Sequence, residues 1–290
     1  MKTDFLSTAL LYISTSSVQT KDTVAAIQQL LPITRNIELS GGCLYDKNLF
    51  KNLMNIKQQE KINFLLHSYF PPPQERFILN FADISEETRS FIKETMRFVN
   101  SLDIDYYSIH AGFKKKFNLE KELLFESDDK KVFMQENIAD NLKWFKMQFP
   151  DKKMALENLY PNNNIECCFM MHIDEIVSMM DDLADIYLLL DLGHLKISSR
   201  ILGFNYLEAA ELLFEKYGNR ILEIHLSENS GMNDDHWILN SNSIQYMIIE
   251  KYANLITQNK INVTIESRGS TLDELLKCLL MVKNAISNTI

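Results

Sequence analysis

Eight short apolar runs recur along the chain, and their number and spacing restrict the fold more than any other feature. Stretches with the pattern of amphipathic helices lie between them. The runs cover residues 5–13, 36–40, 64–70, 106–112, 153–159, 186–194, 221–227 and 261–267. Near-continuous apolar runs are typical of parallel strands that are buried on both faces. Eight strands that alternate with helices predict a (β/α)8 TIM barrel, with residues 1–290 as one domain.

The segment after the third run illustrates the helical pattern. Ser85 is a candidate N-cap, and Glu86 and Glu87 suit the positive end of a helix dipole. The Pro71–Pro73 cluster is expected in a loop, and the stretch Lys114–Lys131 predicts a longer loop and a helix start. A doubly wound open sheet is the competing architecture. The barrel is favoured over it because no Gly-rich phosphate loop follows the first run.

Composition restricts the partners and the compartment. The net charge of −9 argues against a protein that lives on nucleic acid, because phosphate contacts require Lys and Arg. The four cysteines form no C-x-x-C pair, which indicates reduced thiols in a cytoplasmic protein. The N-terminal apolar stretch carries Asp4 and lacks a cleavage site, so a barrel strand explains it better than a signal peptide. No apolar run is long enough to cross a membrane.

Side chains that bind metals gather at the predicted C-terminal ends of the strands and in the loop after the seventh strand. They are His67, His110, Glu157, Asp191, His194, His225, Asp234, His236 and Glu266. Active-site groups of a TIM barrel come from these strand ends. Imidazole and carboxylate groups bind zinc and similar ions, and carboxylates also bind manganese. The pattern predicts one to three divalent metal ions, with Zn²⁺ favoured and Mn²⁺ or Fe²⁺ as alternatives.

Spacing within this set supports a shared site. Asp234 and His236 are two residues apart, so an extended loop would point both the same way. Asp191 and His194 are expected to straddle a turn at Gly193. A single His in a strand is more often a core residue, and a single buried Glu is often a salt-bridge partner. Burying the whole set without a compensating ion would nevertheless be costly, which favours metal binding. Of the six histidines, only His172 falls outside the set.

This strand-by-strand pattern resembles the xylose isomerase-like TIM-barrel superfamily, and the resemblance covers essentially the whole chain. The superfamily contains sugar and sugar-phosphate isomerases and epimerases, and also the endonuclease IV family. In endonuclease IV a trinuclear zinc site takes its ligands from the same strand ends. The resemblance implies that Glu157 bridges two metal ions. It also implies that Asp191, His225 and Glu266 complete one of these sites. The third ion would be held by His194, Asp234 and His236.

The ligand set alone does not choose the reaction, because isomerase/epimerase-like members carry much the same ligands. Several features depart from endonuclease IV. Strand four ends in His110-Ala111-Gly112, where that family has His-Pro-Gly, and a Pro-rich insert follows His67. The loop after His236 lacks the Gly-rich continuation that is usual in both families. Loop Arg and aromatic residues that could insert into a DNA duplex are not evident either. These departures disfavour DNA repair.

Two reactions therefore stay open. The favoured hypothesis is a divalent-metal-dependent sugar or sugar-phosphate isomerase or epimerase, in which Glu157 and Glu266 transfer a proton at a carbon next to a carbonyl. The alternative is an endonuclease IV-like zinc-dependent phosphodiesterase, that is, an AP endonuclease of family 2. Other metal-dependent lyase or sugar chemistry, and a non-catalytic binding protein, are further classes.

Flanking residues are candidates for substrate binding. Arg268 could pair with a phosphate or carboxylate, or form a structural salt bridge. Lys114 could attract an anionic substrate, Glu38 could support the site, and Tyr69 and Trp237 could form its walls. The expected partner is a small-molecule sugar or sugar phosphate, with nucleic acid disfavoured and no membrane. The sequence leaves the oligomeric state open, with a homo-oligomer as one option.

Overall fold

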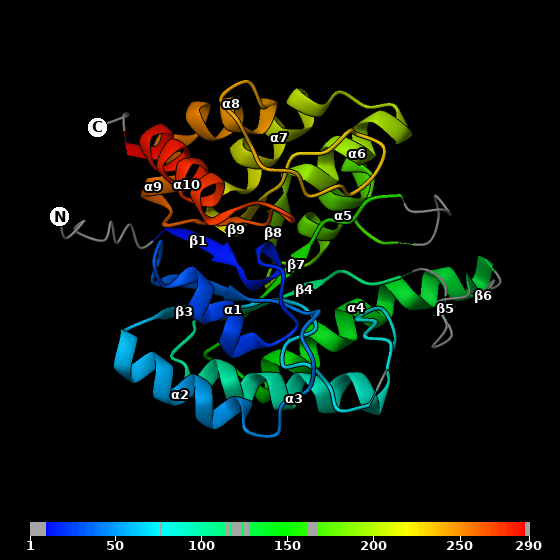
Figure 1. The fold of residues 1–290 in the computed structure, drawn as a ribbon. Helices are drawn as coiled ribbons and strands as arrows, with labels where there is room; N and C mark the ends of the chain where they lie inside the picture. The colour runs from blue at the N-terminus through cyan, green and yellow to red at the C-terminus, as the bar shows by residue number, and fades with distance from the viewer. Residues whose placement is uncertain are drawn as a thin grey trace.

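In the computed structural model, eight parallel strands form a barrel with helices packed around its outside (Figure 1). The structure describes residues 10–75, 77–113, 116–117, 123–124, 128–161 and 168–287. The barrel strands are β1 (Leu11–Ser14), β2 (Asn36–Leu39), β3 (Asn63–Leu66), β4 (Tyr106–His110), β7 (Lys153–Glu157), β8 (Tyr187–Asp191), β9 (Ile221–Leu226) and β10 (Asn262–Ile265). The predicted TIM-barrel fold is confirmed.

The strand order is β3-β2-β1-β10-β9-β8-β7-β4, with every neighbouring pair parallel. The two end strands meet at a parallel bridge between His67 and Ser108. Beside it, the Ser68 N–H donates to the Ser108 carbonyl over 2.8 Å. This contact nearly closes the barrel and brings the ends of β3 and β4 together.

Helices lie between the strands in the chain and cover the barrel. They are α1 (Thr23–Leu30), α2 (Leu49–Glu60), α3 (Glu86–Ser101), α4 (Asp128–Gln148), α5 (Ile173–Asp182), α6 (Leu192–Leu202), α7 (Tyr206–Tyr217), α8 (Ile244–Lys251), α9 (Ala253–Gln258) and α10 (Leu272–Ser287). Ser85 caps α3 as predicted, because its side chain accepts from the Thr88 N–H. A short antiparallel pair, β5 (Lys116–Phe117) with β6 (Leu123–Leu124), lies between β4 and α4 in the chain.

The barrel interior contains polar side chains that contact each other across the barrel. The Tyr106 hydroxyl on β4 donates to Glu223 on β9 over 3.1 Å, although these strands are not neighbours. Thr264 and His225 also face Glu223 from β10 and β9. Because side chains alternate between the faces of a strand, an inward residue places the residue two positions on at the same inner face. This register directs His225 and Glu266 toward the mouth of the barrel.

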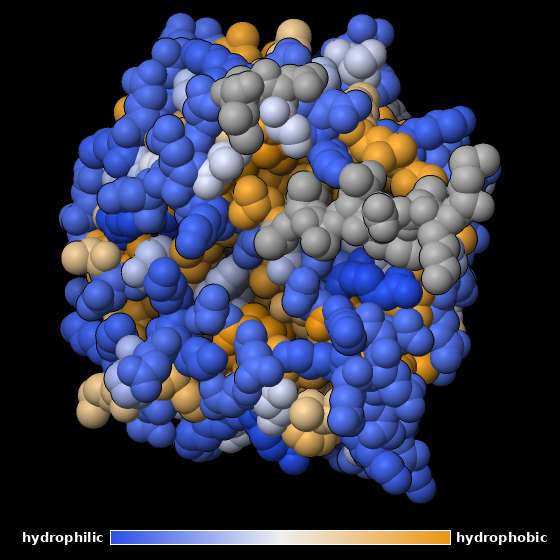
Figure 2. All heavy atoms as spheres, turned by 90° about the vertical axis from the view of Figure 1, so that its left-hand side faces the viewer, coloured by the Kyte–Doolittle hydropathy of each residue, from blue (hydrophilic) through white to orange (hydrophobic). Residues whose placement is uncertain are grey.

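The outer face on the side of the termini is mostly hydrophilic, with hydrophobic residues visible in the hollows between hydrophilic ones (Figure 2). No helix among the described residues is both long and apolar enough to span a membrane. Cys43 and Cys278 are free thiols, and Cys167 lies outside the described residues.

Two local expectations need correction. His67 lies just past β3, which ends at Leu66, and not within the strand. Asp191 and His194 do not straddle a turn, because α6 begins at Leu192, directly after β8. Asp191 is the N-cap of this helix, and its side chain accepts from the His194 N–H over 2.7 Å. The first predicted strand began at residue 5, but residues 1–9 lie outside the described part of the chain.

Candidate metal centre

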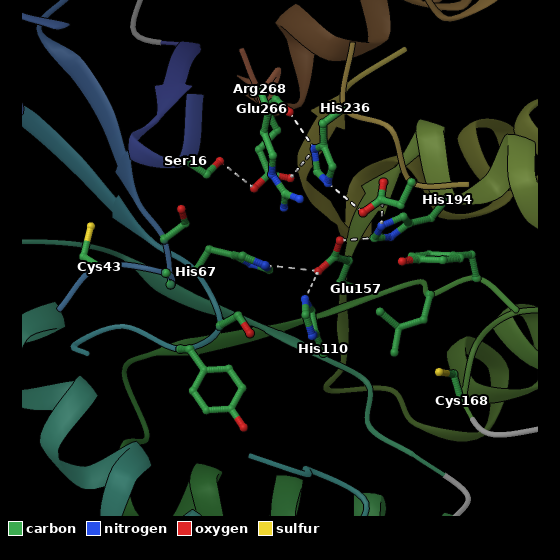
Figure 3. Close-up of a pocket in the computed structure, with 18 of the residues that line it drawn as sticks. Ser16, Cys43, His67, His110, Glu157, Cys168, His194, His236, Glu266 and Arg268 are labelled. Atoms are coloured by element: carbon green, nitrogen blue, oxygen red, sulfur yellow. Dashed lines mark hydrogen bonds and ion pairs between the residues drawn. The ribbon is translucent and has the colours of Figure 1, made fainter. Parts of the chain in front are cut away.

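The nine predicted ligand side chains meet at the C-terminal mouth of the barrel, around a cavity of about 550 Å³. Figure 3 shows His67, His110, Glu157, His194, His236 and Glu266 pointing toward one another in this cavity. Seven of them line this cavity, namely His67, His110, Glu157, His194, Asp234, His236 and Glu266. Asp191 and His225 lie directly beneath and are fully buried. The set divides into three groups around Glu157.

The first group contains His67, His110 and Glu157. The Nε2 atoms of both histidines lie 3.2 Å from the same carboxylate oxygen, Oε2 of Glu157. Glu157 is 1% exposed, whereas about a third of the His110 side chain reaches the cavity. Three nitrogen and oxygen donors therefore converge on one point at the ends of β3, β4 and β7.

The second group contains Asp191, His225 and Glu266, at the ends of β8, β9 and β10. Nδ1 of His225 lies 3.4 Å from Oε2 of Glu266 and 4.0 Å from Oδ2 of Asp191. The ligand atoms of this group all lie within 4.8 Å of one another. Glu157 is within the same distance of Asp191 and His194, so it stands between the groups.

The third group contains His194, Asp234 and His236. Nε2 of His236 lies 2.7 Å from Oδ2 of Asp234, and Nε2 of His194 lies 3.7 Å from the other oxygen, Oδ1. His236 adopts a positive φ of 54°, which is uncommon for a residue other than Gly. His172, expected outside the set, caps α5 by accepting from the Asp174 N–H.

Four buried ligand atoms have no hydrogen-bond partner among the described residues. They are Oε2 of Glu157, Oδ2 of Asp191, Oδ1 of Asp234 and Nδ1 of His225. A buried polar atom without a partner is costly, and each of these atoms belongs to a residue of the three ligand groups. Divalent cations would satisfy all four, and imidazole with carboxylate is the donor set that zinc, manganese and iron accept. The residues therefore fit metal ions.

The charges of the cluster also fit the binding of metal ions. Burial alone would raise the pKa of Glu157, but the charges of His110 and His67 outweigh it and hold the pKa well below its usual range. Burial likewise opposes ionisation of Glu266, yet the hydrogen bond and charge of His225 lower its pKa to about 2. Burial disfavours charged His194, but Asp191 and Asp234 raise its pKa well above 6.5. The buried carboxylates of this cluster are therefore stabilised in their ionised form by positive charge nearby, which either protonated histidines or metal ions can supply.

The flanking candidates fall in different places. Arg268 and Tyr69 line the cavity, and Figure 3 shows Arg268 reaching in beside Glu266. Glu38 lies beneath the cluster, fully buried, with Oε2 2.9 Å from Nε2 of His225. Trp237 does not line the cavity and is 52% exposed, because it follows the inward-facing His236 and the chain alternates there. Lys114 lies outside the described residues.

Several cavity residues were missed from the sequence. Ser16 donates to Oε1 of Glu266 over 3.2 Å, and the Tyr160 ring packs on His194 with centroids 4.7 Å apart. Gly41 approaches Tyr69 so closely that a Cβ would lie 2.8 Å from the Tyr69 Cβ. The Gly41-Gly42 pair directly after a predicted strand was a usable signal for the last of these. A single Ser in a short 3-10 helix, such as Ser16, or a single Tyr in a loop, such as Tyr160, gives no such signal.

A family model described as the xylose isomerase-like TIM barrel matches residues 36–271. A D-tagatose 3-epimerase-like protein superposes with a TM-score of 0.72 at 16% identity, covering 96% of this chain and 97% of that chain. The IOLI protein with a zinc atom gives 0.64 at 14% identity, covering 97% and 99%. A family 2 AP endonuclease from Brucella melitensis gives 0.63 at 13% identity, covering 92% and 96%.

At these identities the solved structures establish the shared fold alone. No curated protein matches the chain. The family model spans most of the barrel, from β2 to the start of α10. The chain therefore belongs to the family of xylose isomerase-like TIM barrels.

Proposed function

We propose that the chain is a divalent-metal-dependent isomerase or epimerase that acts on a sugar or sugar phosphate. One observation carries the proposal: Glu157 and Glu266 each belong to a ligand group, and both line the same cavity. The cavity volume of about 550 Å³ lies within the range of small-molecule sites. A structure of the same fold that is described as D-tagatose 3-epimerase-like supports this substrate class.

His67, His110 and Glu157 would hold one ion, and Glu157 with Asp191, His225 and Glu266 would hold a second. His194, Asp234 and His236 would hold a third. Zn²⁺ is the favoured metal, with Mn²⁺ or Fe²⁺ as alternatives. When bound, such ions polarise a carbonyl and its neighbouring hydroxyl, which acidifies the hydrogen on the carbon between them.

The two glutamates would move the proton. Glu157 ends β7 and Glu266 follows β10, three strands apart in the barrel order, so they approach the cavity from different sides. One carboxylate would accept the proton from carbon, and the other would return a proton from the opposite side or to the neighbouring carbon. Return to the opposite face gives an epimer, and return to the neighbouring carbon gives an isomer.

Arg268 supports an anionic substrate. It is the only Arg or Lys among the described residues that line the cavity, and no ion pair is formed by its exposed side chain within the described part of the chain. Its main chain is fixed by a hydrogen bond from its N–H to the His236 carbonyl over 2.6 Å. An Arg with no carboxylate partner in such a place would bind a phosphate or carboxylate group of the sugar.

Solvent exchange tests the proposal. Proton NMR in heavy water on a panel of ketoses and their phosphates should show metal-dependent loss of a carbon-bound hydrogen. A proton transfer by Glu157 and Glu266 passes through an enediolate-like state that exchanges with solvent. Catalytic turnover without exchange on any sugar would count against this reaction.

The third ligand group favours a second candidate, a metal-dependent phosphodiesterase. Proton transfer needs no third ion, whereas clustered ions suit in-line displacement at phosphorus. The net charge of −9 disfavours a DNA substrate. An abasic oligonucleotide assay on the same preparation distinguishes the two reactions. Efficient incision, with no hydrogen exchange on any sugar, would favour the phosphodiesterase over the isomerase or epimerase.

A further inference from the structure

Three cluster histidines are held at the same ring nitrogen. Nδ1 of His194 lies 2.9 Å from the Asn158 carbonyl, and Nδ1 of His236 lies 2.7 Å from the Glu266 carbonyl. A carbonyl oxygen only accepts, so Nδ1 must carry the hydrogen in both rings. The Nε2 atoms then face Asp234, and each would offer a lone pair to a metal ion once the ion displaces the proton that pairs with this carboxylate.

His67 is also held at Nδ1, in this case by a hydroxyl group that acts as the acceptor. Its Nδ1 lies 3.1 Å from Oγ of Ser108, and that hydroxyl donates its own hydrogen to the Leu66 carbonyl over 3.2 Å. Ser108 can therefore only accept from His67, which again places the hydrogen on Nδ1. Nε2 of His67 faces Glu157 at 3.2 Å.

His225 is oriented the other way. Its Nε2, the nitrogen farther from the backbone, lies 2.9 Å from Oε2 of Glu38. Its Nδ1 faces Glu266 at 3.4 Å and Asp191 at 4.0 Å, and it has no hydrogen-bond partner among the described residues. His225 and Glu38 are both 0% exposed, so no bulk water competes for this contact.

A second buried carboxylate, Glu223, lies near the same nitrogen but is already engaged. Its Oε1 is 3.6 Å from Nε2 of His225, beyond hydrogen-bond distance. That oxygen accepts from the Thr264 hydroxyl over 2.6 Å, and the other accepts from the Tyr106 hydroxyl over 3.1 Å. Oε1 of Glu38, by contrast, has no hydrogen-bond partner among the described residues.

We propose that Glu38 is a positioning residue that fixes His225 with its hydrogen on Nε2, so that Nδ1 faces Asp191 and Glu266. His225 would thus present the opposite nitrogen from His67, His194 and His236. Glu38 lies on β2 and His225 on β9, which are three strands apart in the barrel order, so this contact spans the barrel interior. Its effect on metal binding rests on the proposed function, but the position of the hydrogen does not.

The position of the hydrogen can be read directly by long-range ¹H–¹⁵N NMR on the full chain labelled with ¹⁵N-histidine. In the zinc-loaded protein, His225 should carry its hydrogen on Nε2, while His67, His194 and His236 carry theirs on Nδ1. A hydrogen on Nδ1 of His225 would overturn the proposal. If zinc does not bind, the proposed function fails, and the same spectra in alkaline buffer without metal still decide the tautomer.

Variants test the consequence for metal affinity. Glu38→Leu removes the acceptor and should weaken zinc binding about ten- to hundredfold in competition with a chelator, as loss of a carboxylate behind a ligating His does. Glu38→Gln keeps an acceptor oxygen and should lose less, with Nε2–H retained in the spectra. Glu223→Gln is the matched control, because it removes the neighbouring charge without touching the short contact.

Two outcomes would contradict the role of Glu38. One is a folded Glu38→Leu protein that binds zinc as tightly as wild type. The other is an equal loss in Glu223→Gln, which would assign the effect to buried charge in general. Should Glu38→Leu fail to fold, Glu38→Gln decides: a loss of zinc affinity no larger than that in Glu223→Gln would reject the proposal.

Discussion

The two sides of the barrel mouth differ in chemistry although they belong to one continuous sheet. The ends of β1 and β2 carry hydroxyls and glycines, with Ser14 donating to Ser40 over 3.0 Å. The ends of the other six strands carry the His, Asp and Glu side chains. A hydrogen bond from Ser16 to Glu266 joins the two sides at the cavity, and the contact between Glu38 on β2 and His225 on β9 joins them beneath it. On the proposed function, the ligand side would hold the metal ions and the hydroxyl side would bind the hydroxyl groups of the substrate.

The largest expected effect comes from the ligand side. Glu157→Gln should reduce turnover roughly 10²- to 10⁴-fold, as loss of a positioned acid/base does, and should also lower bound metal. Circular dichroism beside a turnover assay and metal analysis checks this. Glu60→Gln, on a surface carboxylate paired with Arg35, is the control and should change nothing. Full activity of a folded Glu157→Gln protein would remove this residue from the mechanism.

The pH dependence of stability should also distinguish the ligand side from the hydroxyl side, because the buried histidines belong to the ligand side. Burial alone would lower the pKa of His194 and His225, but neighbouring carboxylates raise both well above 6.5. A raised folded-state pKa contributes stability that is full below about pH 6.5 and is lost as the pH rises through the folded value. The melting temperature of metal-free protein should therefore fall from pH 6.5 upward. Zinc affinity should rise over the same range, because zinc displaces these protons.

His172→Asn provides the control for this experiment. Its imidazole lies outside the cluster, so the variant should keep the pH dependence of the wild type. A melting temperature of metal-free protein that rises above pH 6.5 would mean that the cluster histidines are not charged in the absence of metal.

A smaller effect is expected where the two sides meet the substrate. Arg268→Gln should raise KM for an anionic sugar roughly ten- to hundredfold, the cost of one lost charge-assisted hydrogen bond, and leave a neutral sugar unaffected. Steady-state kinetics on a phosphorylated sugar and its neutral parent measures this. Arg200→Gln, whose guanidinium donates to the Ser230 carbonyl, is the matched control. Equal effects on both sugars would show that Arg268 has a structural role only.

The smallest effect should come from the hydroxyl side. Ser16→Ala removes the hydrogen bond to Glu266 and should lower kcat/KM about two- to tenfold, the worth of one neutral hydrogen bond. Metal content should stay at the wild-type level. Ser178→Ala, on the exposed face of α5, controls for loss of a hydroxyl. Loss of bound metal in Ser16→Ala would show that this serine contributes to metal binding, and would contradict the distinction between a ligand side and a hydroxyl side.

Much of this architecture could be predicted from the sequence, because buried parallel strands leave continuous apolar runs. The nine ligand candidates could be grouped since parallel strands bring their ends to one edge, as His67, Asp191 and Glu266 illustrate. That residues 1–290 form one domain stays a prediction.

Other features could not be predicted because they depend on contacts between distant strands. The direction of the His225 ring follows from Glu38, 187 positions away in sequence. The helix that begins at Leu192 depends on capping by Asp191, a residue that also suits a turn. Glu223 could have been found, because it precedes His225 by two positions and shares its face.

Metal content tests the central claim most directly. Elemental analysis of the purified full chain, before and after reconstitution with zinc, manganese or iron, counts ions per chain. The three ligand groups around Glu157 predict more than one equivalent of transition metal, with a reduced count in Glu157→Gln. Wild-type protein without bound transition metal, and without any uptake on reconstitution, would contradict the account.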